Sequence, residues 1–152
     1  MNLQAYLDEM GVRYSMSQHP AVFTAQALAE AEHVSGHQVI KPVLIEADGR
    51  FVLCALPACA RIDLDKMREL LHADQVNLAQ EKKLGEIFND CELGAEPPIG
   101  RMYGLQTFVD SSVFRDDHVT FQAGSHEQSI TMPMSEYRRL AQPQIANFTH
   151  EM

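Results

Sequence analysis

The segment Gly94–Gly100 holds the residue types that fix a backbone and bring it close to a ligand. Two glycines enclose two adjacent prolines within seven residues. Proline fixes φ, removes a backbone donor and forces the preceding residue to extend, whereas glycine allows a close approach to the main chain. The segment therefore predicts a stiff loop, with these N–H groups available to a ligand: Ala95, Glu96, Ile99 and Gly100. The alternative is a plain rigid turn.

Lys41 stands inside an otherwise apolar run and is the candidate cation of a site. A lysine ammonium can hold a phosphate or a carbonyl oxygen as a compact point charge. The alternative is an outward-facing lysine on an edge strand, where such a charge discourages aggregation. Because the neighbouring Pro42 cannot donate a ladder hydrogen bond, the strand should be an edge or irregular at this point.

Three further positions are candidates for contact with a substrate. Gly124 lies in a turn between two apolar segments and would let the backbone approach a ligand. His126 follows directly and either sets the specificity of a pocket or is an ordinary surface histidine of a turn. His19 precedes Pro20 and either binds the substrate or caps a turn.

The sequence predicts neither a metal site nor a cofactor. His33 and His37 stand four residues apart, but Ser35 and Gly36 interrupt the helix that would align them. The cysteines fit no zinc-ligand spacing and are interpreted as small buried hydrophobes without an activating histidine beside them: Cys54, Cys59 and Cys91. No Ser-His-Asp constellation is apparent, so no general base is assigned.

Length and composition predict one domain spanning residues 1–152. The chain has 152 residues, of which 45% are hydrophobic and 22% charged, as is typical of a globular protein with its own core. No apolar run approaches the roughly 20 residues that span a bilayer, and the N-terminus lacks the pattern of a secretion signal. A cytoplasmic protein without a membrane partner is expected.

The net charge of −9 excludes broad binding to a nucleic-acid backbone, since such binding needs clustered lysine and arginine. DNA is therefore not an expected partner. An RNA substrate remains compatible if only its end is gripped, in a locally basic pocket that draws on three candidate cations: Lys41, Arg61 and Arg101.

Hydrophobic periodicity and capping residues predict helices interleaved with short strands. Expected helices are Leu3–Met10 (with Asn2 as N-cap), Ala25–Ala31 after Thr24, Leu64–Leu71 after Asp63, Gln80–Phe88, and a closing helix capped by Ser135. Expected strands are Val12–Met16, Gln38–Ala47, Arg50–Leu56, Val76–Leu78, Gln106–Asp110, His118–Gln122 and Gln128–Met132. Apolar runs flanking Asp48-Gly49 predict a hairpin, and the polar tail from about residue 144 is expected to be loose.

This interleaving lacks strict βαβ alternation and favours an α+β fold with a mixed or antiparallel sheet.

Four motifs, in order, resemble the YbaK/ProX family of aminoacyl-tRNA editing domains over residues 1–141. They are His19-Pro20 with Thr24, Val39-Ile40-Lys41, the spacing of Gly94, Pro98 and Gly100, and Phe121–His126 followed by Ile130. The resemblance implies a curved mixed sheet, partly barrel-like, surrounded by helices.

The resemblance also implies roles for individual residues. It carries a functional lysine to Lys41 and a substrate-lining loop to Gly94, Pro98 and Gly100, with His19, Thr24, Gly124 and His126 as further substrate-binding candidates. The turn Ala123–His126 resembles that of the alanine-clearing editors. The resemblance further implies that hydrolysis relies partly on the ribose hydroxyl of the substrate.

The function implied is trans-editing: hydrolysis of the ester of misacylated tRNA, with alanyl-tRNA(Pro) as the expected substrate. Partners are then the tRNA acceptor end, bound weakly by this domain alone, and prolyl-tRNA synthetase. Glu96-Pro97 depart from the small or hydroxyl residues usual in the loop, and Ile99–Arg101 depart from an aromatic residue or leucine. Two alternatives are a binding module of the same fold that has lost hydrolysis, which the acidic charge and Glu96 favour, and a small-molecule ester or thioester hydrolase.

Overall fold

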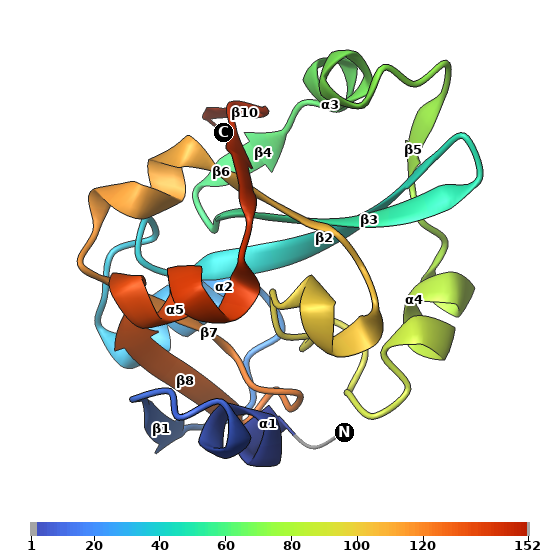
Figure 1. Ribbon diagram of the computed structural model, residues 1–152. Helices are drawn as coiled ribbons and strands as arrows, with labels where there is room; N and C mark the ends of the chain where they lie inside the picture. The colour runs from blue at the N-terminus through green and yellow to red at the C-terminus, as the bar shows by residue number, and fades with distance from the viewer. Residues whose placement is uncertain (1–2, 152) are drawn as a thin grey trace.

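A long hairpin forms the centre of the structure (Figure 1). In this computed structural model, which describes residues 3–151, β2 (Ile40–Ala47) and β3 (Arg50–Pro57) pair antiparallel along their whole length. Asp48 and Gly49 have φ of 48° and 88°, the left-handed values that a two-residue hairpin turn requires. The hairpin predicted from the Asp-Gly pair is confirmed.

The hairpin lies within a mixed five-stranded sheet in the order β5-β2-β3-β6-β9. Its other members are β5 (Val76–Leu78), β6 (Thr107–Asp110) and β9 (Gln144–Ala146), and β6 is parallel to both of its neighbours. β5 pairs with β2 only at residues 45–47. Lys41 and Pro42 therefore lie on a half of β2 that β5 leaves unpaired, which confirms the edge predicted at Pro42.

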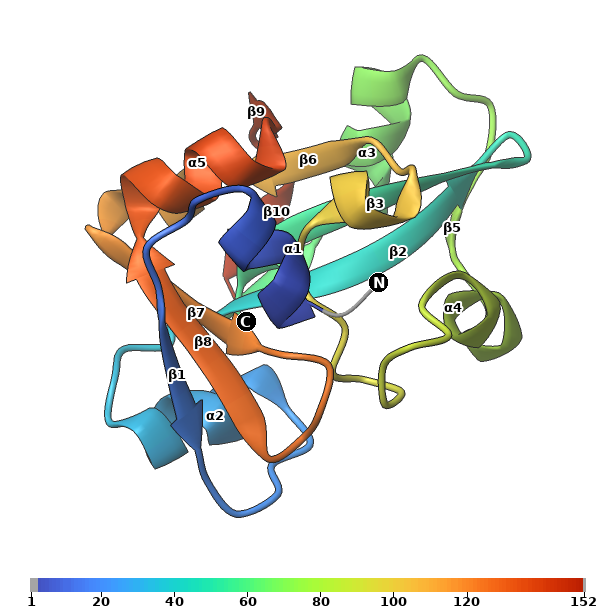
Figure 2. The same cartoon turned by 60° about the horizontal axis from the view of Figure 1, so that its bottom comes forward.

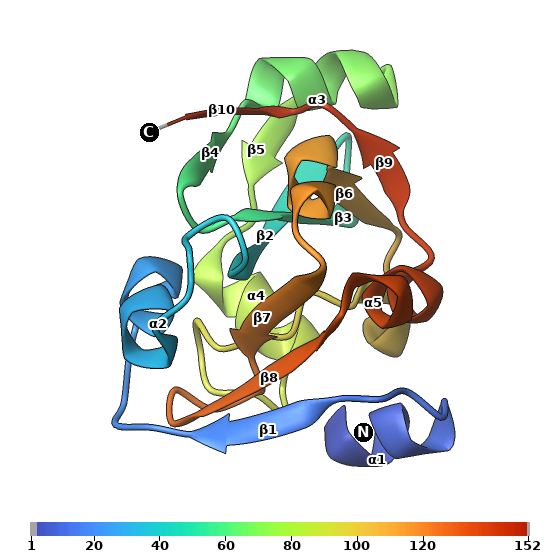
Figure 3. The same cartoon turned by 90° about the vertical axis from the view of Figure 1, so that its left-hand side faces the viewer.

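A second sheet has the order β1-β8-β7 and is antiparallel throughout. It is formed by β1 (Ser15–Gln18), β7 (His118–Gln122) and β8 (Gln128–Pro133). A parallel bridge between Val39 and Thr120 connects it to the start of β2, and the Thr120 N–H donates to the Gln38 carbonyl at 3.0 Å. Figure 3 shows the two sheets lying one above the other. The expected α+β fold with a curved mixed sheet is confirmed.

Helices surround these sheets (Figure 2). They are α1 (Leu3–Glu9), α2 (Ala25–Glu32), α3 (Leu64–Leu71), α4 (Glu81–Ile87), α5 (Met134–Ala141) and the short 3₁₀ turns η1 (Gly100–Tyr103) and η2 (Ser111–Arg115). Thr24 and Asp63 cap α2 and α3 as predicted, through bonds to the N–H groups of the first turn. The cap predicted at Asn2 lies outside the described residues.

The start of α5 differs from the prediction. Pro133 occupies the N-cap position and Ser135 lies inside the helix, because the strand β8 runs directly into α5. The helix packs its buried face, including Tyr137 and Leu140, into the largest hydrophobic cluster, between α1 and the strands β7 and β8. Burial of such side chains is the main stabilising contribution to a fold of this size.

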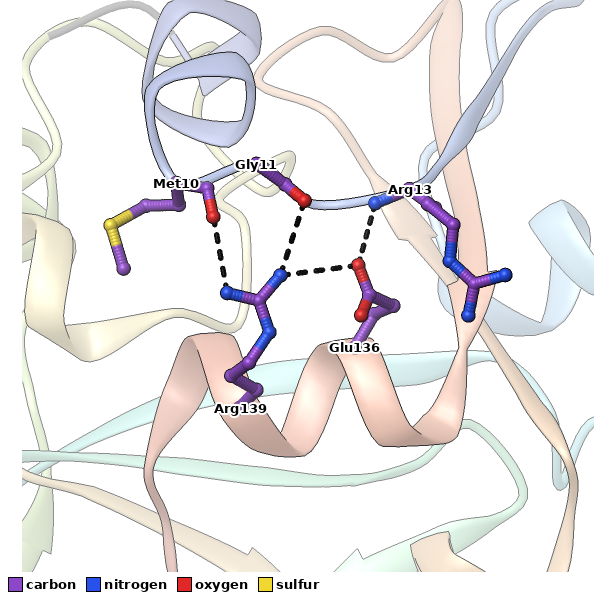
Figure 4. A network of polar contacts seen from close by, with 5 residues as sticks. All are labelled: Met10, Gly11, Arg13, Glu136 and Arg139. Carbon is purple, nitrogen blue, oxygen red and sulfur yellow. Dashed lines mark hydrogen bonds and ion pairs between the residues drawn. The ribbon is translucent and has the colours of Figure 1, made fainter.

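The other face of α5 holds the segment that follows α1 (Figure 4). Arg139 donates to the carbonyls of Met10 and Gly11 at 3.1 and 3.2 Å. The Glu136 carboxylate accepts the Arg13 N–H at 2.6 Å and pairs with Arg139 at 3.3 Å. Arg139 thus satisfies carbonyls at the end of α1 that have no partner within the helix.

Residues 144–151 include two paired strands, so the prediction of a loose tail is wrong for this part of the chain. β9 pairs with β6, and β10 (Thr149–Glu151) pairs with β4 (Ala60–Ile62). Between these strands Phe148 is fully buried. Its N–H donates to Asp110 at 2.9 Å and its carbonyl accepts from the Asp63 N–H at 2.7 Å. These partners are distant in sequence, so the local polar composition concealed the pairing.

Candidate active site

A cavity of about 490 Å³, called the main cavity because Lys41 lines it, opens beside the unpaired half of β2. Its walls come from α2, β2, the turn before β4, α4, β7 and the Gly94–Gly100 loop. The lining residues are Thr24, Ala25, Gln26, Leu28, Ile40, Lys41, Pro42, Ala58, Leu84, Gly94, Glu96 and Gln122. Apolar walls with a few polar groups are typical of a small-molecule site.

Lys41 is the only lysine or arginine among the described residues that line this cavity. The side chain is half-buried and its Nζ donates to the Ala58 carbonyl at 3.3 Å. Burial lowers the pKa of Lys41 from its ordinary value; Cys59 opposes this shift and the nearby Arg61 adds to it. The structure thus presents a partly desolvated ammonium to the cavity, where its charge is screened less than on the surface.

Three of the four N–H groups of the Gly94–Gly100 loop that were predicted to be available to a ligand are bonded within the protein. Ala95 donates to the Glu92 carbonyl at 3.0 Å and Ile99 to the Pro97 carbonyl at 2.8 Å. Gly100 donates to the Thr107 hydroxyl at 2.9 Å. Because these donors are already used, the loop is a rigid turn and supplies none of them to an oxyanion.

Of the predicted loop residues, only Gly94 lines the cavity. Pro98 is buried, and its carbonyl accepts from the Tyr137 hydroxyl at 2.7 Å, which anchors the loop to α5. A Cβ on Gly100 would lie 2.8 Å from the Leu105 carbonyl oxygen, so a close backbone approach requires this glycine. Pro98 and Gly100 therefore determine the conformation of the loop and do not line the cavity.

Glu96 lines the cavity. From the sequence, only its N–H was a candidate donor to a ligand, and its side chain was noted as a departure from the family pattern that favours a binding module. Glu96 is 5% exposed and is the only carboxylate among the described lining residues. Its Oε2 accepts the Gly94 N–H at 2.8 Å. Burial raises the pKa of Glu96, while bonds from the N–H groups of Gly94 and of Glu96 itself, and the nearby His126, oppose the rise.

The β7–β8 turn at Gly124 is hydrogen-bonded to the Gly94–Gly100 loop and to the residues just before it. Gly124 has φ of 85°, a left-handed value that favours glycine. Its N–H donates to the Ala95 carbonyl and its carbonyl accepts from the Glu92 N–H, both at 2.8 Å. The β7–β8 turn and the Gly94–Gly100 loop are thereby held together as one unit.

His126 packs behind the cavity wall and is no free surface histidine. Its Nδ1 lies 3.0 Å from the Val22 carbonyl and its Nε2 lies 2.8 Å from the Leu93 carbonyl. The ring also contacts Phe23, with centroids 4.7 Å apart. A Cβ on Gly94 would lie 3.3 Å from its Cε1. His126 thus positions Gly94, which lines the cavity, without lining it itself.

His19 is not brought into the main cavity. It borders a separate hollow of about 220 Å³, and its Nδ1 lies 2.8 Å from the Pro20 carbonyl. The two remaining candidate cations also differ: Arg61 is close enough to act on Lys41, whereas Arg101 donates to the Leu140 carbonyl at 3.2 Å and does not line the cavity.

A histidine does lie beside one cysteine, contrary to the sequence interpretation. Cys59 Sγ is 3.4 Å from His37 Nδ1, and the two residues are 22 positions apart. Both border a second cavity of about 320 Å³, next to Lys66, Arg115 and His150. Sequence spacing could not reveal this pair, because the turn that joins β3 to β4 brings it together.

Iodoacetamide at neutral pH should alkylate Cys59 about tenfold faster, or more, than Cys54 and Cys91, because the thiolate is the reactive form. Burial raises the pKa of Cys54 to about 12 and that of Cys91 to about 11. Peptide mass spectrometry of the folded protein over time measures all three rates. Equal labelling of Cys59 and Cys91 would contradict this expectation, and unfolding in urea should equalise the rates.

Within residues 3–151, no three histidine, cysteine, aspartate or glutamate side chains form a group that could hold a metal ion. Over the same residues, no helix has the length and apolarity needed to cross a membrane.

Comparison with known proteins identifies the family. The family model of the aminoacyl-tRNA editing domain matches residues 19–140 of this sequence. These residues include all those that line the cavity and the β7–β8 turn at Gly124. The chain belongs to the aminoacyl-tRNA editing domain family. As a member of this family the editing domain is an aminoacyl-tRNA deacylase, a hydrolase that acts on an ester bond, as its sequence predicted.

Two curated relatives place the editing domain more closely. It is 28% identical over 151 residues to the multifunctional Ser/Thr-tRNA deacylase ProXp-y of Escherichia coli (strain K12), covering 96% of this chain and 90% of the relative. It is 33% identical over 98 residues to proline–tRNA ligase of Bacillus subtilis (strain 168), covering 62% of this chain and 16% of the ligase.

The fold of the editing domain also matches solved structures. A crystal structure of a candidate trans-editing enzyme for prolyl tRNA synthetase superimposes with a TM-score of 0.87, at 21% identity and over 97% of this chain and 94% of the other. A hypothetical protein, APE2540, gives the same TM-score at 17% identity, over 97% of this chain and 98% of the other. These matches confirm the fold.

Proposed function

We propose that this editing domain acts in trans on tRNA(Pro) carrying a small amino acid, with alanine as the first candidate and serine as the second. The observation that carries the proposal is the cavity that combines Lys41 with apolar walls. Thr24 and Gln122 also line it and would suit a seryl or threonyl hydroxyl, in keeping with the activity named for the Escherichia coli relative.

In the proposed reaction, water adds to the ester carbonyl carbon and the bond to the ribose oxygen breaks. The amino acid leaves as the free acid, and the ribose hydroxyl regains a proton. Negative charge develops on the carbonyl oxygen, and preorganised donors that meet such charge supply a large part of catalysis. Since the loop N–H groups are bonded internally, this role falls to the Lys41 ammonium.

No side chain is assigned as the base that activates the water. The resemblance implies that a ribose hydroxyl of the substrate takes part, and the cavity must then hold the terminal adenosine in place. The acidic chain, with its net charge of −9, would grip only this end of the tRNA. The domain alone should therefore bind tRNA weakly. It should act together with prolyl-tRNA synthetase in the cytoplasm, where tRNA is charged.

A panel of charged tRNAs tests the proposed specificity. Single-turnover hydrolysis should be fastest for alanyl- or seryl-tRNA(Pro), slower for threonyl-tRNA(Pro), and close to the uncatalysed rate for prolyl-tRNA(Pro). Ethyl esters of the same amino acids distinguish a small-molecule hydrolase, which would cleave them as readily. Binding of the tRNAs without hydrolysis would support the binding-module alternative instead.

His126→Ala should widen the range of amino acids cleared, because the ring fixes Gly94 at the cavity wall. We expect the rate for threonyl- relative to alanyl-tRNA(Pro) to rise about tenfold, within the 1–3 kcal/mol that steric fit in a pocket supplies. The exposed His118 on β7 provides the matched control, His118→Ala. An equal loss on every substrate would instead indicate direct action on the ester, and an unchanged preference and rate would contradict both roles.

A further inference from the structure

The main cavity contains one carboxylate and one ammonium, and the proposed reaction uses only the second. Glu96 and Lys41 both line it, from the Gly94–Gly100 loop and from β2. Glu96 is 5% exposed, whereas buried carboxylates are rare unless a partner compensates the loss of water. The described residues lining the cavity offer no second cation to serve as that partner.

The contacts of Glu96 leave room for a further donor. One oxygen, Oε2, accepts the Gly94 N–H at 2.8 Å. A carboxylate offers about four lone-pair sites on its two oxygens, so this bond and one from its own N–H do not saturate it. Burial raises the pKa of Glu96, and a cation brought beside it would favour its ionised form.

The substrate class carries such a cation. Every aminoacyl ester has an α-amino group on the carbon next to the reacting carbonyl, and in its protonated form this group donates three hydrogen bonds. In the transition state, the adjacent carbonyl oxygen carries the opposite charge, which the proposed reaction assigns to Lys41. A cavity with one carboxylate and one ammonium matches this pair of charges.

We propose that Glu96 binds the α-ammonium group of the aminoacyl ester and so restricts the cavity to acyl groups with a free amino group. This inference rests on the proposed deacylase function and adds a recognition rule to it. Esters whose amino group is acylated, as in peptidyl-tRNA, lack the positive charge and carry extra bulk at the same point. They should therefore be spared.

Rates on substrates with and without an α-amino group distinguish binding of the ammonium by Glu96 from a purely structural role of this residue. If Glu96 only holds Gly94 in place, its loss should slow all substrates alike. If it binds the ammonium, its loss should affect substrates with an amino group and leave those without one unchanged. Lactyl-tRNA(Pro), in which a hydroxyl replaces the amino group of alanine, has almost the same size and provides this comparison.

The experiment measures kcat/KM of the wild-type protein, of Glu96→Gln and of the control Glu81→Gln on alanyl-, lactyl- and N-acetylalanyl-tRNA(Pro). Glu81 lies in the first turn of α4 and is exposed. The wild type and Glu81→Gln should prefer alanyl- over lactyl-tRNA(Pro) by about tenfold or more, or about 1.4 kcal/mol. Glu96→Gln should lose most of this preference through a slower reaction with the alanyl substrate.

Equal wild-type rates on alanyl- and lactyl-tRNA(Pro), or a preference retained in folded Glu96→Gln, would overturn the inference while leaving the deacylase function standing. No hydrolysis of any substrate by the wild type would instead remove the proposed function and this inference with it. Should Glu96→Gln fail to fold, calorimetry of the wild type decides: the non-hydrolysable 3′-alanylamido-adenosine should bind more tightly than its lactylamido analogue, and equal binding would reject the inference.

Discussion

Replacing Lys41 with alanine should lower the single-turnover rate of deacylation by about tenfold or more, equivalent to about 1.4 kcal/mol of transition-state stabilisation. Lys41 is the only cation among the described residues lining the main cavity, and the loop N–H groups that might replace it are already bonded. The measurement is hydrolysis of alanyl- or seryl-tRNA(Pro), whichever the wild type cleaves faster, with excess protein.

The fold should tolerate this change, because the Lys41 side chain is only half-buried and its hydrogen bond is to a single carbonyl, that of Ala58. Circular dichroism and thermal unfolding check this point. Lys82→Ala, on the exposed side of α4, is the matched control and should retain full activity. A folded Lys41→Ala protein with the wild-type rate would contradict the assignment.

Replacing Phe148 with alanine should lower the free energy of unfolding by about 3–5 kcal/mol, the usual cost of removing a fully buried phenylalanine. Phe148 is 0% exposed and belongs to a cluster that includes Cys54, Leu56 and Met67. Urea unfolding followed by circular dichroism measures the change. The loss is large against the roughly 5–15 kcal/mol that stabilises a typical domain.

Ile145→Ala provides the control, since Ile145 is an apolar residue of the same tail but is 41% exposed. Its loss should cost much less than that of Phe148. If both variants unfold at nearly the wild-type urea concentration, the tail contributes nothing to the core and its pairing with β6 and β4 is unimportant for stability.

Local signals predicted the parts of the fold that a few neighbouring residues determine. The Asp48-Gly49 turn needs only two residues that tolerate positive φ, and the caps at Thr24 and Asp63 need only a side-chain oxygen before a helical pattern. The tail was missed because its order depends on distant partners. Asp110 and Asp63 bind the Phe148 backbone, and no pattern within residues 144–151 records those bonds.

The candidate site shows the same division. Lys41, predicted as catalytic, and Thr24 and Gly94, predicted as substrate-binding, all line the cavity, and their roles there stay predictions. A lone lysine in an apolar run and a glycine at the end of a loop are visible in the sequence. Whether a backbone N–H is free depends on the rest of the fold. The Thr107 hydroxyl, for example, takes the donor of Gly100.

Contacts between side chains that are distant in sequence could not be predicted from the sequence. Cys59 and His37 approach one another across the turn before β4, and Glu96 lines the cavity because its loop is anchored at Pro98. From the sequence, its side chain was noted only as a departure from the family pattern that favours a binding module. In the structure it is buried within the loop instead and binds Gly94.

The central claim is that this protein hydrolyses the ester of tRNA(Pro) charged with a small amino acid. Its most direct test is the single-turnover rate at which the purified protein releases alanine or serine from the corresponding tRNA(Pro), compared with the rate without protein. We predict that hydrolysis of at least one of these two substrates is accelerated by roughly 10²-fold or more, the lower end of what positioned catalytic groups supply. Hydrolysis of prolyl-tRNA(Pro) should not be accelerated. Release of both amino acids at the uncatalysed rate would contradict the account.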